Sequence, residues 1–242
     1  MGIFENLTTG GLKETVDSLG GSFDPKPSAA YDAVITMAYA GKSSRSNAQS
    51  ITVHATIDGA EFKETIWVTN TKGENFYLSK DGKKTKNPLP GFTTVEDLCL
   101  LTTGSPLAEQ PTEEKAVKIF DYDTRKEIPK QVQVLVDLLG KEVKLGVLRE
   151  IVDKTQLADS GQYLPTGETR TQNVINKVFH GETGRTVNEY RHEIAEPDFL
   201  TAWKLRNEGK DRNRAKGVAA NSAGMSGTGR PTGAVPAKKL FG

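Results

Sequence analysis

The dipeptide Asp58-Gly59, placed between two runs of alternating apolar and polar residues, is the feature that most restricts the fold. Residues 50–58 and 61–70 flank it, and both runs show the two-residue period of a strand with one packed face. Asp-Gly is a preferred connection between adjacent antiparallel strands. The sequence therefore predicts a tight β-hairpin whose polar face is free to bind a ligand.

The polar face of this hairpin carries an aromatic ring. In the first strand it consists of Thr52, His54 and Thr56, and in the second Trp67 lies beside Lys63 and Thr65. Residues 73–88 predict another hairpin, in which the aromatics Phe76 and Tyr77 precede an Asp81-Gly82 turn surrounded by four lysines: Lys80, Lys83, Lys84 and Lys86. Exposed aromatic rings can stack on unpaired bases while flexible cations neutralise phosphates. This combination predicts single-stranded nucleic-acid binding.

Three further strands are predicted at residues 31–40, 142–153 and 169–180, with Gly146 marking a bulge or a bend. Together with the first hairpin they suggest a mainly β, five-stranded barrel. The basic loop after the first of them supplies Lys42 and Arg45, and the two later strands supply Arg149 and Lys177. These four residues complete the predicted nucleic-acid-binding set.

The chain divides into three parts by composition. Residues 1–28 predict an N-terminal arm, and residues 29–207 predict the β domain. That domain contains a mixed insertion at about 71–135, which includes the second predicted hairpin and a short helix predicted at 95–101, and it ends in a C-terminal helix at 189–207. Residues 208–242 are rich in Gly, Ala and Ser, are basic, and contain few large apolar side chains. Such a segment predicts a disordered tail.

Composition argues against several classes of protein. The formal net charge is only +1, so a nucleic-acid site has to come from local clusters of cations. The single cysteine, Cys99, lies in an apolar run and predicts a buried structural thiol in a reducing compartment. His54, His180 and His192 lack metal-ligand spacing, and no catalytic motif is found. We therefore expect no cofactor, no metal and no enzymatic activity.

Membrane association is not expected either. No apolar stretch approaches the roughly twenty residues that span a bilayer, and the first residues lack the order of a secretory signal. The expectation is a soluble intracellular protein.

Four segments together resemble the single-stranded DNA-binding proteins encoded by tailed bacteriophages: ETIWVTNTKGENFY, PLPGFTTVEDLCLLTTG, LLGKEVKLGVLRE and the terminal KKLFG. The resemblance implies an oligonucleotide-binding (OB) barrel that acts in phage DNA replication or recombination in the host cytoplasm. It places Lys63, Thr65 and Trp67 on the binding face. It places a flanking hairpin beside them, with Lys80, Lys83, Lys84 and either Phe76 or Tyr77.

The chain departs from this family in its tail. Many such proteins end in an acidic segment that recruits replication partners, whereas this tail is basic. Leu240 and Phe241 remain a predicted anchor for replication or recombination proteins, and the neighbouring lysines a source of phosphate contacts.

Two other classes of function stay open at this stage. One is a phage structural or assembly protein that binds other proteins through the exposed β face and the tail. The other is an enzyme acting on nucleic acid, for which scattered carboxylates such as Asp121, Asp123 and Asp137 would have to assemble a metal site.

Overall fold

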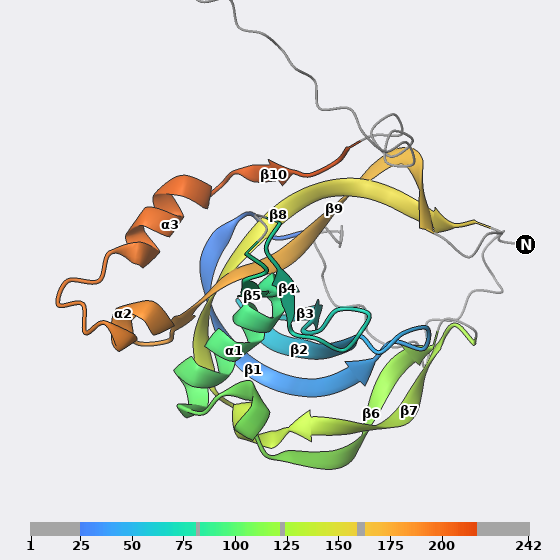
Figure 1. Cartoon of the computed structure of the whole chain (residues 1–242), viewed down its shortest axis with the longest axis horizontal. Helices are drawn as coiled ribbons and strands as arrows, with labels where there is room; N and C mark the ends of the chain where they lie inside the picture. Colours follow the sequence, from blue (N-terminus) through green and yellow to red (C-terminus); the bar gives the residue numbers. More distant parts are fainter. Residues whose placement is uncertain (1–24, 81–82, 122–123, 159–162, 217–242) are drawn as a thin grey trace, which may run out of the picture.

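The computed structural model describes residues 25–80, 83–121, 124–158 and 163–216, and these form a mainly β structure (Figure 1). The elements, in chain order, are β1 (Ala29–Lys42), β2 (Gln49–Ile57), β3 (Ala60–Trp67), β4 (Phe76–Leu78), β5 (Lys86–Pro88), α1 (Pro90–Thr103), η1 (Leu107–Glu109), β6 (Thr112–Asp121), β7 (Lys126–Leu135), η2 (Val136–Leu138), β8 (Glu142–Leu157), β9 (Tyr163–His180), α2 (Val187–Arg191), α3 (Phe199–Asn207) and β10 (Asp211–Asn213).

The first predicted hairpin is confirmed as β2 and β3. Ile57 pairs with Ala60, so the connection has two residues. Asp58 and Gly59 both have positive φ, 52° and 75°, which is the backbone conformation that the twist of a tight hairpin requires. The strands β1, β8 and β9 likewise contain the three other predicted strands.

Strand β1 is the centre of the sheet because it has different partners along its length. Its N-terminal half pairs with β8, its C-terminal half pairs with β2, and Tyr39 also pairs with Val134 of β7. Ala33 and Val34 pair with both strands, and a register shift between Ile35 and Met37 follows them. The resulting order is β9-β8-β1-β2-β3, with the β6–β7 hairpin attached to β1.

The two ends of this strand order are linked by a side chain instead of a ladder. Glu64 of β3 accepts a hydrogen bond from the backbone N–H of Ile175 in β9, at 2.6 Å. In the part of the chain that the structure describes, β3 and β9 do not pair, so the sheet is not closed. The mainly β prediction is therefore confirmed, and the five-stranded closed barrel is not.

Helix α1 covers one side of the sheet and completes the core. Its buried residues Val95, Leu98 and Cys99 pack with inward-facing residues of the strands, among them Val53 and Leu145. Burial raises the pKa of the Cys99 thiol to about 12, which agrees with the predicted role as an inert structural thiol. The predicted short helix at 95–101 is thus part of a longer helix.

Helix α3 packs against the outside of β8 and β9 through Trp203. The indole ring lies so close to Gly146 that a Cβ there would be 3.0 Å from it, and the indole Nε1 donates a hydrogen bond to Asn176 Oδ1 at 2.8 Å. The bulge predicted at Gly146 is confirmed by a register shift between Gly146 and Val147. The glycine therefore serves both the bend and the close approach of α3.

The prediction of one continuous helix at 189–207 is wrong. Helix α2 ends at Arg191 and α3 begins at Phe199. Glu193 has a φ of 48°, outside the helical region, and Pro197 then disfavours helical backbone in the residue before it.

The tail boundary predicted at residue 208 is also wrong for the residues that can be described. Asp211–Asn213 form β10, which pairs in parallel with Arg149, Glu150 and Ile151 of β8. Strand β1 pairs with β8 only as far as Val147, and β10 occupies the edge that this leaves. Residues 217–242 of the predicted tail, and 1–24 of the predicted arm, lie outside the described residues.

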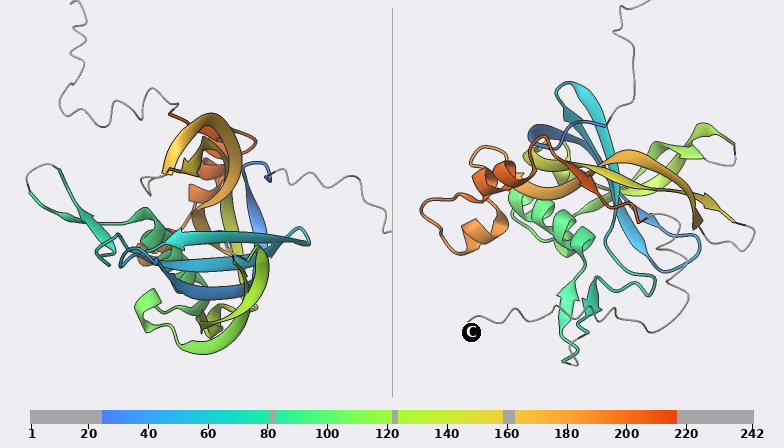
Figure 2. Two further views of the ribbon diagram at one scale, coloured as in Figure 1. Left: turned by 90° about the vertical axis from the view of Figure 1, so that its right-hand side faces the viewer. Right: turned by 90° about the horizontal axis from the view of Figure 1, so that it is seen from above.

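The insertion at 71–135 contains two hairpins on either side of α1. The predicted second hairpin is β4–β5, which projects from the body of the molecule in both views of Figure 2. The other hairpin of the insertion, β6–β7, was not predicted from the sequence. Among the described helices, none is long and apolar enough to cross a membrane.

Candidate nucleic-acid interface

Trp67 lies at the C-terminal end of β3 with half of its surface, 50%, exposed. Its neighbours Ile66 and Val68 point the other way and are buried, so the strand is anchored beneath the ring. Helix α1 begins directly against this point: a Cβ built on Gly91 would lie 2.2 Å from the Trp67 carbonyl oxygen. A rigid backbone therefore presents a flat, exposed aromatic ring to solvent, as a base-stacking platform requires.

Lys63 and Thr65 share the face of β3 that carries Trp67, and both are exposed. The Thr65 hydroxyl lies 2.9 Å from the Thr52 hydroxyl on the paired strand. The face therefore offers one cation and one hydroxyl group in line with the ring.

The prediction that the polar face of β2 is free to bind a ligand is wrong, because most of that face is covered. Thr52 is only 5% exposed, and the His54 ring is largely covered. Tyr39 of β1 pairs with Thr52, and its ring centroid lies 5.8 Å from that of His54. The Tyr39 ring of the neighbouring strand covers the shorter side chains of Thr52 and His54. The exposed part of the predicted polar face is therefore the part on β3.

The base of the β4–β5 hairpin is held by the Asn70 side chain and by backbone hydrogen bonds. The Asn70 oxygen accepts hydrogen bonds from the backbone N–H groups of Lys72 and Glu74, at 2.9 and 3.0 Å, and its amide nitrogen donates to Glu74 Oε2. Leu89 N–H also donates to the Asn75 carbonyl at 2.9 Å. These bonds set the direction in which the hairpin leaves β3.

Phe76 and Tyr77 lie on opposite faces of this hairpin, because successive residues of a strand alternate. The Lys86 ammonium is 4.4 Å from the Phe76 ring centroid, a cation–π contact that occupies this ring. Tyr77 is 51% exposed. Only one of the two rings can therefore join a given binding face, and Tyr77 is the more accessible of them.

Four lysines surround the end of the hairpin. Lys80, Lys83, Lys84 and Lys86 are all exposed, and the predicted Asp81-Gly82 turn lies outside the described residues. A bond from Ser79 N–H to the Thr85 carbonyl, at 2.8 Å, continues the ladder toward the tip. The hairpin thus carries a concentration of positive charge that the overall composition does not show.

The loop that bears Arg45 is brought beside the base of this hairpin. Asn47 N–H donates to the Thr71 carbonyl at 3.1 Å, and Gln49 N–H donates to the Thr69 hydroxyl at 2.7 Å. Lys42 and Arg45 are exposed at the end of β1 and in this loop. The structure therefore places the basic loop next to the base of the lysine hairpin, and this hairpin follows β3, the strand that carries Trp67, in the chain.

Two predicted site residues are engaged elsewhere. Lys177 forms an ion pair with Asp97 of α1, with 2.6 Å between Nζ and Oδ2. Arg149 donates two hydrogen bonds to Asp211 of β10, at 2.8 and 2.9 Å. These charges hold α1 and β10 in place, so we leave both residues out of the candidate interface.

The long β8–β9 hairpin carries an exposed ring that was not predicted from the sequence. Tyr163 is 66% exposed, and Leu157 and Leu164 beside it are about half exposed. Phe120, near the end of β6, is also exposed. The run Tyr163-Leu164-Pro165 was visible in the sequence, but nothing in it distinguishes an exposed aromatic from a core residue.

In the described part of the chain, no group of three or more His, Cys, Asp or Glu side chains is placed to hold a metal ion. Comparisons of the chain with protein-family models, with curated proteins and with solved structures find no match.

Proposed function

We propose that this protein binds single-stranded DNA without catalysing a reaction, and that it coats and protects the strand during phage DNA replication or recombination. The observation that carries the proposal is the half-exposed Trp67 ring on a rigid strand, next to the lysine-bearing hairpin. In this mechanism the rings of Trp67 and Tyr77 stack on bases, while Lys63 and the hairpin lysines contact phosphates.

The strand order supports an OB-type barrel for this function. In the order β9-β8-β1-β2-β3, one bulged strand is shared between two partners and a helix lies between β3 and β8 in the chain. An OB fold is a partly open five-stranded barrel whose strand face and loops bind oligonucleotides. We propose that the Glu64–Ile175 hydrogen bond holds together the open side, between β3 and β9.

Replacing Lys80 and Lys84 by glutamine is expected to weaken binding and to lower its dependence on salt. Each phosphate contact to a single strand contributes about 0.7 to the slope of log K against log salt, so two lost contacts reduce it by roughly 1.4. Fluorescence anisotropy with a labelled single strand of mixed sequence, at several salt concentrations, measures both effects.

The matched control is the Lys141→Gln, Lys204→Gln double variant, which removes the same charge from residues outside the candidate interface. It is expected to keep the slope of the parent protein. Equal slopes for the two double variants would show that the hairpin does not contact the strand.

The second candidate function, an assembly protein, is favoured by the exposed apolar pair Leu157 and Tyr163, which lie opposite each other on β8 and β9. On that account the protein forms a stable oligomer without nucleic acid, and Tyr163→Ser disperses it. Sedimentation of the DNA-free protein distinguishes the two functions, because coating of a strand requires no preformed oligomer.

A further inference from the structure

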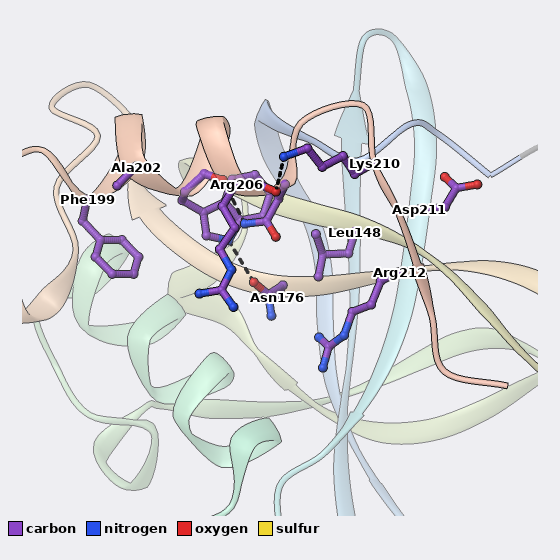
Figure 3. Close-up of a pocket in the computed structure, with 10 residues that line it drawn as sticks. Leu148, Asn176, Phe199, Ala202, Arg206, Lys210, Asp211 and Arg212 are labelled. Carbon is purple, nitrogen blue, oxygen red and sulfur yellow. Dashed lines mark hydrogen bonds between the residues drawn. The ribbon is translucent and has the colours of Figure 1, made fainter. Parts of the chain in front are cut away.

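A cavity of about 650 Å³ lies among α3, β8, β9 and β10, away from the elements that carry the candidate interface (Figure 3). One part of its wall is apolar, formed by Leu148, Phe199, Ala202 and Trp203. The other part is polar and mainly basic, formed by Asn176, Arg206, Asn207, Lys210, Asp211 and Arg212. The volume falls within the range of small-molecule sites, about 300–1,000 Å³.

Asn176 is held in one orientation at this cavity. Its Oδ1 accepts the hydrogen bond from Trp203 Nε1 at 2.8 Å, so its NH₂ group is directed away from the indole. In Figure 3 the Asn176 amide lies between the guanidinium groups of Arg206 and Arg212. Three sets of N–H donors thus come from α3, β9 and β10 to line one space.

The positive charge of this wall is not cancelled by the acidic residue beside it. The Asp211 carboxylate is already taken by Arg149. Arg212 lies 3.5 Å from the buried Glu150, which Arg214 also approaches at 3.6 Å, so one carboxylate serves two guanidinium groups. In the described ranges the ion-paired arginines are Arg149, Arg212 and Arg214, and Arg206 is not among them. The cavity therefore has an excess of positive charge.

We propose that this cavity binds the phosphate monoester of a nucleotide, either free or at the end of a strand. A monoester carries about −1.5 to −2 charge at neutral pH and has three acceptor oxygens, which match two guanidinium groups and an amide. A carboxylate has one charge and two oxygens, and matches them less well. Phe199, 46% exposed, is the surface on which the sugar or base rests.

This site is independent of the proposed interface, since it shares no residue with it. Isothermal titration of the full chain with dTMP is expected to show saturable binding that inorganic phosphate competes with. Arg206→Gln should weaken dTMP binding about tenfold or more, because it removes a charge-assisted contact. Asn176→Asp keeps an acceptor for the Trp203 indole and replaces the NH₂ donor by a negative charge, so it should weaken binding similarly.

Arg191→Gln is the matched control, because Arg191 is an exposed helical arginine that does not line the cavity. It is expected to bind dTMP as the parent does. A 5′-phosphorylated oligonucleotide that binds more tightly than its 5′-hydroxyl form, with the difference lost in Arg206→Gln, identifies a strand end as the source of the phosphate. Sensitivity to Arg206→Gln for dTMP alone identifies a free nucleotide.

The proposal is overturned if the parent protein does not bind dTMP, or if Arg206→Gln binds it equally well. Binding of an acidic peptide that depends on Arg206, without any binding of dTMP, would also overturn it and would assign the cavity to a carboxylate.

Discussion

Gly91→Ala is expected to destabilise the protein by about 1–3 kcal/mol, although alanine is the better helix former. Gly91 lies in the first turn of α1, and a Cβ there would be 2.2 Å from the Trp67 carbonyl oxygen and 3.0 Å from Ile66 Cγ2. A backbone oxygen cannot turn aside as a flexible side chain can. The helix therefore has to move away from β3, and its buried residues Val95 and Leu98 move with it.

Urea unfolding followed by circular dichroism measures this effect. Its sign is the decisive quantity, because an uncrowded Gly→Ala change in a helix stabilises by up to about 1 kcal/mol. A Gly91→Ala protein more stable than its parent would contradict the tight contact between α1 and β3. Thr94→Ala in the same helix controls for changes in helix propensity, because the contact that it removes is a hydroxyl hydrogen bond to the Pro90 carbonyl of the helix itself, at 3.0 Å.

Glu64→Gln is expected to stabilise the protein above neutral pH and to have little effect near pH 4.5. Burial raises the pKa of Glu64 to about 7 from its ordinary value of 4.5, although the hydrogen bond from Ile175 opposes the shift. Between these two values the folded protein retains a proton that the unfolded chain has lost. The free energy of unfolding therefore falls as pH rises through this window, by about 3 kcal/mol in all.

Glutamine removes this loss because it cannot ionise, and its amide oxygen can still accept the hydrogen bond from Ile175. Unfolding free energies at pH 4.5, 6 and 8 test the prediction, with the exposed Glu114→Gln as the control. If the parent and Glu64→Gln lost stability equally between pH 4.5 and 8, Glu64 would not be the group responsible.

The parts of the fold that the sequence predicted are those with a local physical cause. Asp58-Gly59 predicts the turn that it forms, strict alternation of apolar and polar residues predicts β2 and β3, and Gly146 indicates a bulge. Strand β10 has no such cause. Its residues are all polar and exposed, and it forms because β8 has an unpaired edge beyond the end of β1. Such strand pairing depends on tertiary structure, so no local pattern in the sequence predicts it.

The candidate site divides in the same way. Exposure of Trp67 and Tyr77 was predictable from alternation and from the lysines around them. The ion pairs of Lys177 and Arg149 could not be predicted in this way. Their partners, Asp97 and Asp211, are 80 and 62 residues away in the chain. The covering of Thr52 and His54 by Tyr39 likewise depends on which strand lies next to β2.

Stacking of Trp67 on the bases of a single strand can be measured by the fluorescence of the Trp203→Phe protein, in which Trp67 is the one remaining tryptophan. Titration with a mixed-sequence single strand of about 30 nucleotides is expected to quench this fluorescence saturably, less at high salt and much less with the matching duplex. Unchanged Trp67 fluorescence throughout the titration would show that Trp67 does not stack on the bases of the strand.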